Sequence, residues 1–289
     1  MELDLHRGGS GEPLVLLHGI GHTWRGWKPM LPLLEQRFDV LAPDLPGFGH
    51  SPPLPAGVAS TPEALADAAE GAMDEHGFET AHFAGNSLGA WIALELARRG
   101  RARTCVGLSP AGLAHARERD LARAVLLGTR WLARNTPPPR PLLRTQVGRT
   151  LFSGPMLGKP WRADAADIVE QTALLAAAPG FDLTLSETLD RQVAGLTEIR
   201  CPVLVLWGTK DVVLIPRQGR RFERLIPNCQ LRYLKGLGHV PMSDDPELLA
   251  TAIADFALAP GVGERSRTIP LWCRHTTRSR QREQEGPRR

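Results

Sequence analysis

The sequence predicts an α/β protein with a doubly wound, mostly parallel sheet and a helical cap insertion. Short apolar runs alternate with helical patterns in the first and last parts of the chain. These runs lack regular polar alternation, which is typical of strands buried on both faces of a parallel sheet. The alternation stops between about 112 and 193, where helical patterns and a proline cluster replace the strands. Together these observations predict a sheet core covered by a helical lid.

The expected elements follow one another in a regular order. Strands are predicted at 13–19, 38–44, 80–86, 103–109, 202–208 and 229–235, and helices at 27–36, 62–76, 88–99, 216–225 and 246–258. The helix near 62 has the clearest start, because Ser60 or Thr61 can cap it and Pro62 suits its first position. We therefore assign 1–111 and 194–259 to the core and 112–193 to the cap.

Charge is distributed unevenly along the chain. The formal net charge is +4, but the segment from Gly263 to Arg289 carries eight arginines and three glutamates, a net of +5. Subtracting this +5 from +4 leaves −1 for residues 1–262. The core therefore shows no charge signature of nucleic-acid binding. Residues 260–289 are polar and arginine-rich, which predicts a disordered basic tail.

Cysteine spacing and hydropathy narrow the class of protein further. Four cysteines lie far apart and form no C-x-x-C pair, so neither a disulfide framework nor a zinc site is expected: Cys105, Cys201, Cys229 and Cys273. No apolar run approaches the roughly 18 residues that a membrane span needs. The N-terminal segment MELDLHRGGSGEP lacks the basic start and apolar core of a secretory signal. We expect a cytoplasmic protein without a membrane span.

The predicted cap contains an arginine-rich helical pattern. Two sets of side chains fall on opposite sides of 119–134, the arginines Arg119, Arg123, Arg130 and Arg134 and the apolar Leu121, Val125, Trp131 and Leu132. From 112 to 160, nine basic residues stand against two acidic ones, a net of +7. A solvated helix face is one interpretation. A docking surface for an acidic substrate or carrier is the alternative.

The stretch Gly85-Asn86-Ser87-Leu88-Gly89 joins a predicted buried strand to a predicted helix. In this context, G-x-S-x-G is typical of a serine nucleophile on a sharp turn, because the glycines let the backbone bend without side-chain clashes. The amide of Leu88, at the helix N-terminus, would point toward a developing oxyanion. Ser87 is therefore the predicted nucleophile.

A second oxyanion donor is expected from the loop after the first predicted strand. The loop reads His18-Gly19-Ile20-Gly21, and its glycines allow backbone N–H groups to turn inward. We expect the amide of Ile20 to be the donor. His18, Gly19 and Gly21 are expected to support the loop rather than to transfer protons.

A serine nucleophile needs a base and a carboxylate that orients the base. The loop after 202–208 offers Asp211, and the loop after 229–235 offers His239. Both follow Ser87 in the order Ser, acid, His that this kind of site requires. Asp244 and Asp245 come after His239, beside the last helix, and are better interpreted as capping residues. The sequence thus predicts Ser87, Asp211 and His239 as the catalytic residues.

Five segments in order resemble the α/β-hydrolase superfamily: LVLLHGIG, DLPGFGHS, GNSLGAW, VLWGTKDVV and GLGHVPMSDDP. The likeness runs from about 3 to 258 and points to the capped branch of serine esterases, lipases and haloperoxidase-like enzymes. It implies cleavage of a small carboxylic ester through an acyl-enzyme, with no cofactor and no metal. The short N-terminus implies that an antiparallel strand, usual before the first parallel strand, is missing. Residues 260–289 have no counterpart in the family pattern.

The resemblance leaves the reaction open. Haloalkane dehalogenases and epoxide hydrolases resemble the pattern but carry aspartate at the position of Ser87, whereas carbon–carbon bond hydrolases of aromatic ring cleavage share the GNS elbow. Cleavage of a carbon–carbon bond in a vinylogous diketone, or of another acyl bond, is therefore the alternative. A non-catalytic binding protein of the same fold is a third interpretation. The segment GPMLGKP, 154–160, is one residue short of a phosphate loop.

Four tryptophans are candidates for an apolar acyl pocket. Trp24 and Trp27 follow the oxyanion loop, and Trp131 and Trp161 lie in the predicted cap. Large aromatic side chains at such positions can line a binding site or simply pack in a core. Both interpretations are kept for each tryptophan.

Overall fold

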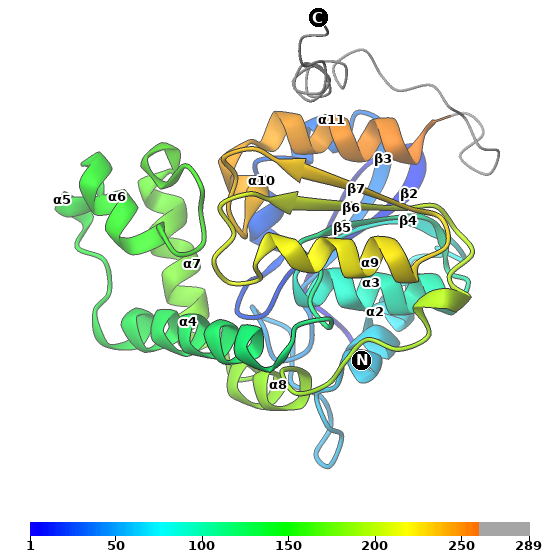
Figure 1. The fold of residues 1–289 in the computed structure, drawn as a ribbon, viewed down its shortest axis with the longest axis horizontal. Helices are drawn as coiled ribbons and strands as arrows, with labels where there is room; N and C mark the ends of the chain where they lie inside the picture. Colours follow the sequence, from blue (N-terminus) through cyan, green and yellow to red (C-terminus); the bar gives the residue numbers. More distant parts are fainter. Residues whose placement is uncertain (260–289) are drawn as a thin grey trace, which may run out of the picture. The chain divides into compact units, whose positions relative to one another are not determined.

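A seven-stranded sheet lies at the centre of the computed structural model, which describes residues 1–259 (Figure 1). The strands, in the order β1-β3-β2-β4-β5-β6-β7, are β1 (Leu5–Gly9), β3 (Phe38–Pro43), β2 (Glu12–Leu17), β4 (Ala81–Asn86), β5 (Ala102–Leu108), β6 (Val203–Gly208) and β7 (Cys229–Leu234). All neighbours pair in parallel except β1 with β3. The predicted doubly wound, mostly parallel sheet is confirmed.

Helices cover both faces of the sheet (Figure 1). One face carries α2 (Pro62–Glu75), α3 (Leu88–Arg98) and α9 (Gly219–Leu225), and the other carries α1 (Leu31–Leu34) and α11 (Pro246–Ala257). Short turns complete the core: η1 (Trp24–Trp27), η3 (Leu196–Glu198), η4 (Pro216–Gln218) and α10 (Pro241–Asp244). Among the described residues, no helix is long and apolar enough to cross a membrane.

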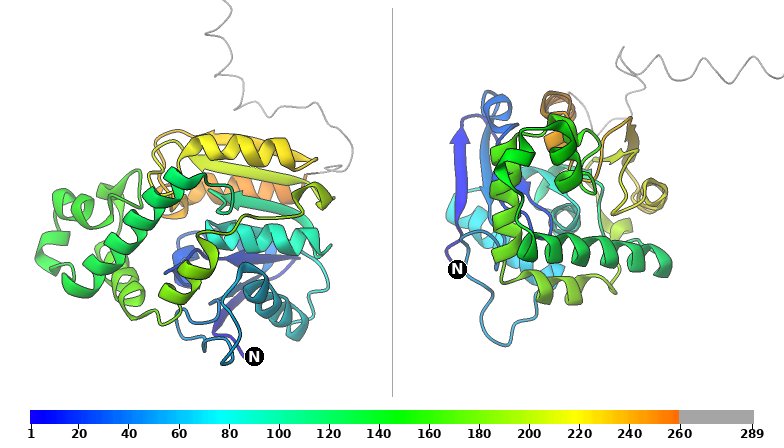
Figure 2. Two further views of the ribbon diagram at one scale, coloured as in Figure 1. Left: turned by 60° about the horizontal axis from the view of Figure 1, so that its bottom comes forward. Right: turned by 90° about the vertical axis from the view of Figure 1, so that its left-hand side faces the viewer.

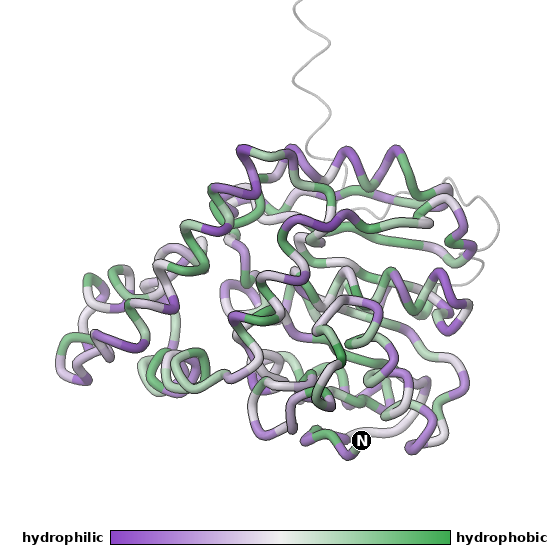
Figure 3. The backbone as a smooth tube through the Cα atoms, turned by 90° about the horizontal axis from the view of Figure 1, so that it is seen from below, coloured by the Kyte–Doolittle hydropathy of each residue, from purple (hydrophilic) through white to green (hydrophobic). Residues whose placement is uncertain are grey.

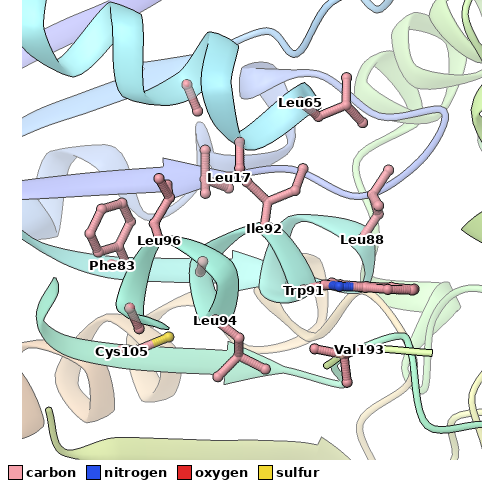
Figure 4. Packing of buried hydrophobic residues seen from close by; sticks show 14 of the residues in the cluster. Leu17, Leu65, Phe83, Leu88, Trp91, Ile92, Leu94, Leu96, Cys105 and Val193 are labelled. Carbon is pink, nitrogen blue, oxygen red and sulfur yellow. The ribbon is translucent and has the colours of Figure 1, made fainter. Parts of the chain in front are cut away.

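Helix α3 is the best-buried helix of the core. Figure 4 shows its residues Ile92 and Leu96 beside Leu17 of β2 and Phe83 of β4. All four side chains are completely shielded from solvent, and burying one such side chain stabilises a fold by about 1.5–3 kcal/mol. Since α3 begins directly after β4, this packing fixes the turn between them, which is where Ser87 lies.

Strand β1 corrects the expectation that an antiparallel strand before the first parallel strand is missing. Its five residues, LHRGG, pair antiparallel with β3, from Leu5 opposite Pro43 to Gly9 opposite Asp39. Glycine has a weak intrinsic preference for strands, so the segment gives little sequence signal. Here the glycines are required for close approach, because a Cβ at Gly9 would collide with the carbonyl oxygen of Phe38.

The helix predicted at 27–36 is also corrected. The structure has the 3₁₀ turn η1 and the four-residue helix α1 instead. Pro29 and Pro32 divide this stretch. Proline is tolerated only in the first turn of a helix, so a continuous helix cannot form, and Pro32 accordingly lies in the first turn of α1.

A helical cap fills the long connection between β5 and β6. It contains α4 (Ala116–Asn135), α5 (Arg140–Leu143), α6 (Gln146–Ser153), η2 (Pro160–Arg162), α7 (Ala165–Ala177) and α8 (Phe181–Thr188). Within 109–202, all of which the structure describes, there is no strand. Figures 1 and 2 show the cap beyond the carboxyl ends of the strands. The predicted disorder of 260–289, which includes Cys273, lies outside the described residues.

The orientation predicted for the arginine-rich helix of the cap is wrong. Arg130 of α4 is only 3% exposed, whereas Trp131 is 63% exposed. The Arg130 guanidinium lies over the Phe181 ring and donates to the carbonyl oxygens of Leu175 (2.6 Å) and Ala178 (2.8 Å). The Leu175 carbonyl lies in the last turn of α7 and the Ala178 carbonyl just past its end. Carbonyls at a helix C-terminus lack full helical pairing, so a buried donor there is favourable. The prediction was wrong because it used helical periodicity alone, which places the arginine side of α4 toward solvent.

Candidate active site

Ser87 lies on a strained turn between β4 and α3. Its backbone angles are φ 56° and ψ −113°, a region that residues other than glycine rarely adopt. A Cβ at Gly85 would collide with the carbonyl oxygen of Gly89, and one at Gly89 would collide with that of Leu17. Both glycines are thus required because three backbone segments meet at the turn.

His239 and Asp211 form a buried pair at the end of the sheet. The Nδ1 atom of His239 lies 2.8 Å from Oδ2 of Asp211, and the two residues are 4% and 3% exposed. The other oxygen of Asp211 accepts the amides of Val213 (2.9 Å) and Leu214 (2.8 Å). An ionised carboxylate only accepts hydrogen bonds, so Nδ1 of His239 carries the proton and Nε2 is free to take another.

Ser87 shares a cavity with His239 of this pair. Its side chain and that of His239 line the same cavity, although Ser87 Oγ makes no hydrogen bond within residues 1–259. The structure therefore brings the three residues predicted from chain order to one place. Nucleophile–base hydrogen bonds are often made only once substrate is bound.

Asn86, whose role the sequence left unassigned, connects the serine turn to the histidine loop. Its Nδ2 donates to the carbonyl oxygens of His239 (2.9 Å) and Leu108 (3.2 Å), and the side chain is 1% exposed. His239 is 153 positions away in the sequence. No local pattern could have identified this partner.

His18 holds the oxyanion loop as a neutral imidazole. Its Nε2 accepts the amide of Leu45 at 2.8 Å, so its Nδ1 carries the proton and donates to the carbonyl of Gly19, also at 2.8 Å. Complete burial lowers the pKa of His18 to about 3. The expected supporting role of His18 agrees with these contacts, because both ring nitrogens are used within the loop region.

Two backbone amides are free beside Ser87. Neither Ile20 nor Leu88 donates a backbone hydrogen bond within the described part of the chain. The loop turns because His22 N–H bonds to the Gly19 carbonyl at 3.1 Å while Gly21 adopts φ +75°, the pattern of a type II turn. At Gly19, a Cβ would lie 3.2 Å from the Cβ of Ser87. The two amides are thus available to an oxyanion formed at Ser87.

Two apolar cavities meet at Ser87. The first, of about 50 Å³, runs past Trp91 and Leu185, and the second, of about 40 Å³, runs past Phe181 and His239. Ile20, Ser87 and Leu126 line both. One cavity on each side of a nucleophile can hold the acyl group and the leaving group of a substrate.

The proposed acyl-pocket tryptophans do not line these cavities. Trp27 is completely buried, and Trp24 stacks on His6 at 5.1 Å. Trp131 and Trp161 are 63% and 39% exposed. Trp24 and Trp27 belong to η1, Trp161 to η2 and Trp131 to α4, and none of these elements directs its tryptophan ring into the cavities.

Other residues, which were not predicted from the sequence, line the two cavities. Trp91, 3% exposed, lies four positions after Ser87 on the first turn of α3 and lines the first cavity (Figure 4). Since residues four apart share a helix face, this position was identifiable from Ser87. Leu126 of the cap had no such signal, because its position depends on how α4 packs on the core.

His22 was also missed. It lines the second cavity beside His239, and its Nδ1 has no partner within the described residues. Burial, with a smaller contribution from His239, lowers the pKa of His22 to about 4. Its imidazole therefore stays neutral near pH 7 and can hydrogen-bond to a group in the cavity. Within residues 1–259, no group of three or more His, Cys, Asp or Glu side chains is arranged to hold a metal ion.

Comparison with known proteins agrees with this fold. A model of the alpha/beta hydrolase family matches residues 14–252. The chain therefore belongs to the α/β-hydrolase family, and it is a hydrolase.

Three relatives illustrate the range of that family. The chain is 33% identical to the epoxide hydrolase EphH of Mycobacterium tuberculosis, over 66% of this chain and 92% of the relative. It is 26% identical to 2-hydroxy-6-oxononadienedioate/2-hydroxy-6-oxononatrienedioate hydrolase 2 of Pseudomonas putida, over 89% and 92%. A thermophilic esterase from Thermogutta terrifontis is similar in structure, with a TM-score of 0.69 and 26% identity over 88% of this chain and 92% of the esterase.

Proposed function

We propose that the protein is a serine hydrolase that cleaves carboxylic esters through an acyl-enzyme on Ser87. The observation that carries the proposal is the strained Ser87 in one cavity with His239, which is paired with Asp211, beside two free amides. An imidazole with a free Nε2 is the form that a general base needs. Preorganised amides stabilise the charge that develops on a carbonyl oxygen.

The reaction follows from these positions. Ser87 Oγ attacks the acyl carbon while His239 Nε2 takes its proton, and the carbonyl electrons move to oxygen, which the amides of Ile20 and Leu88 bind. The intermediate collapses, the alcohol leaves with the proton from His239, and the acyl group remains on Ser87. A water molecule, deprotonated by His239, then releases the acid. Asp211 stabilises the imidazolium throughout.

Cleavage of a carbon–carbon bond is the second candidate. It is favoured by the similarity to the P. putida dienedioate hydrolase, which extends over nearly the full length of both chains. The same triad would serve either bond. Similarity to EphH does not extend to an epoxide mechanism in this proposal, because Ser87 stands where epoxide hydrolases of the superfamily carry aspartate.

A labelling experiment tests the serine mechanism. A fluorophosphonate should label Ser87, and Ser87→Ala should abolish labelling and lower kcat for p-nitrophenyl butyrate by on the order of 10⁴-fold. Ser109→Ala is a matched control, since Ser109 is also buried and has φ 45°. The fluorophosphonate should still label Ser87 in this variant. An unlabelled wild type, or an active Ser87→Ala, overturns the proposal. A vinylogous 1,5-diketone in the same assay distinguishes the two bond types.

A further inference from the structure

The stretch of the cap from the end of α4 to η2 has an unusual composition. We call residues 131–162 the cap tip; they include the end of α4, α5, α6 and η2 (Figures 1 and 2). This stretch contains six basic residues and no aspartate or glutamate: Arg134, Arg140, Arg144, Arg149, Lys159 and Arg162. A segment of this length with one sign of charge creates a local positive field, whatever the net charge of the whole core.

Three other arginines of α4 have carboxylate partners. Arg119 and Arg123 share Asp190 at 3.4 and 3.0 Å, and Arg130 lies 3.3 Å from Asp182. Their charges are therefore partly balanced within the cap. Most arginines of the tip have no such partner.

Four arginines of the tip have no carboxylate partner. Arg140, Arg144, Arg149 and Arg162 form no ion pair with any described residue. Arg149 binds backbone, donating to the carbonyl oxygens of Leu143 (3.1 Å) and Trp161 (3.0 Å). It thereby joins α5, α6 and η2 into one unit, which the direct packing of α6 on both neighbours also supports.

The same unit exposes large apolar side chains. Val147 and Leu151 of α6 are 75% and 63% exposed, and as residues four apart they lie on one face of the helix. Trp131 (63%) and Leu142 (37%) add further exposed apolar surface, whereas the Trp161 ring (39%) lies 5.6 Å from the ammonium of Lys210 in the core. Figure 3 shows hydrophobic and hydrophilic residues interleaved along this end of the cap. Helix α6 therefore turns an apolar pair toward solvent.

We propose that the cap tip docks on the surface of an anionic lipid bilayer. Exposed Val, Leu and Trp side chains enter the boundary between headgroups and acyl chains, and unpaired arginines attract anionic headgroups. A projecting tip suits a bilayer, which it can enter without a complementary pocket. A second copy suits it less, because a two-fold contact through this face would bring the unpaired arginines of both copies together.

Vesicle co-sedimentation of the full chain tests this proposal independently of the proposed esterase activity. The chain carries Ser87→Ala, so that lipid is not consumed. We expect binding to phosphatidylcholine vesicles that contain about one third phosphatidylglycerol, weaker binding to phosphatidylcholine alone, and release by salt. Val147→Ser with Leu151→Ser should weaken the anionic-vesicle binding about tenfold.

The charge is tested by a second pair of changes with a matched control. Arg140→Gln with Arg144→Gln should also weaken binding about tenfold, whereas Arg220→Gln with Arg224→Gln, two exposed arginines of the core helix α9, should not. All variants retain residues 260–289, so any contribution of that segment is equal in each. Circular dichroism melting checks that every variant is folded.

Three outcomes would overturn the proposal. The first is a wild-type chain that does not bind anionic vesicles. The second is binding that neither pair of tip substitutions weakens, which would place the contact elsewhere in the chain. The third is a dimer in size-exclusion chromatography that Val147→Ser with Leu151→Ser dissociates, which would show that a second copy covers the apolar face.

Discussion

Ser87 occupies a backbone conformation that costs about 1–3 kcal/mol and is held there by its surroundings. Its N–H donates to the carbonyl of Leu108 at 2.9 Å, and its carbonyl accepts the amides of Trp91 (3.2 Å) and Ala111 (3.1 Å). The neighbouring Asn86 adds its contact with the His239 loop. The strain is therefore offset by hydrogen bonds from β5, α3 and the histidine loop, which keep the hydroxyl at the cavity.

His18 makes the stability of the fold depend on pH. Its pKa is about 3 in the folded chain and about 6.5 when unfolded. As pH falls below about 6.5, the unfolded chain takes up the proton first, so the folded state loses stability until about pH 3. At pH 5 the loss from this residue is about 2 kcal/mol. In urea unfolding, His18→Gln should reduce the difference in unfolding free energy between pH 7 and pH 5 by about this amount.

The control for this prediction is His50→Gln. His50 is exposed and its imidazole makes no hydrogen bond within the described residues, so its removal should leave the pH dependence of the unfolding free energy as in the wild type. A His18→Gln variant that keeps the full wild-type pH dependence would show that His18 is not the titrating group.

At the residue scale, sequence order located Ser87, Asp211 and His239 because loops after parallel strands meet at one edge of the sheet. The roles of Asn86 and Leu126 depend on contacts between segments far apart in the chain, which no local pattern contains. The tryptophans were misplaced for the same reason. An aromatic side chain is often buried, and its residue type alone indicates this. Whether each tryptophan ring faces the core, solvent or a cavity depends on how η1, η2 and the cap pack.

Among the elements, the cap is fastened to the core by buried carboxylates. Asp244, 4% exposed, accepts the amides of Gly158 (2.9 Å) and Lys159 (2.7 Å) from the cap and of Gly238 (2.7 Å) from the histidine loop. Its predicted role as a helix cap is corrected, whereas Asp245 does cap α11 through the amide of Leu248. The segment 154–160, which resembled a phosphate loop in sequence, thus attaches the cap to the core through Asp244.

Asp244→Asn should loosen the cap beside His239. An amide side chain offers one accepting oxygen instead of two, so buried N–H groups lose partners, each at a cost of about 1–3 kcal/mol. Amide exchange at Gly158, Lys159 and Gly238 should accelerate by about tenfold or more. Asp245→Asn is the control, because Asp245 binds only the Lys159 side chain and α11. Equal exchange at Gly158 in both variants would contradict this account of Asp244.

A second attachment joins the start of α4 to η4 and α9. Glu118 accepts hydrogen bonds from Arg221 (2.5 Å) and Arg217 (2.7 Å), and from the amide of His115 (2.8 Å). Burial alone would raise the pKa of Glu118, but these donors outweigh it and lower the pKa to about 2. The carboxylate therefore stays ionised at neutral and mildly acidic pH, and this end of the cap remains attached.

Helices and strands were predicted correctly where local sequence signals such as helix caps determine them. They were missed where contacts with distant segments determine them. Thr61 caps α2 with Pro62 at its start, as the sequence predicts. Strand β1 was missed because its glycine-rich residues become a strand only through pairing with β3. The side of α4 that faces inward could not be read from its periodicity, since the C-terminal carbonyls of α7 draw Arg130 inside.

For the molecule as a whole, substrate size should be set where the cap meets the core. The two cavities at Ser87 measure about 50 and 40 Å³, and a single water molecule needs about 10–15 Å³ on this measure. We therefore expect kcat/KM to be highest for p-nitrophenyl acetate to butyrate and to fall more than about tenfold by the octanoate.

Leu126 tests whether the cap sets this limit, because it lines both cavities and comes from α4. Leu126→Ala removes the side chain between them, and the preferred acyl chain should lengthen by two or more carbons, at roughly 2 kcal/mol of stability. Leu121→Ala is the matched control, since Leu121 belongs to the same helix but is 43% exposed and lines neither cavity. If the acyl-length profile of Leu126→Ala equals that of Leu121→Ala, the cap moves away from Ser87 when substrate binds and the core alone selects the chain.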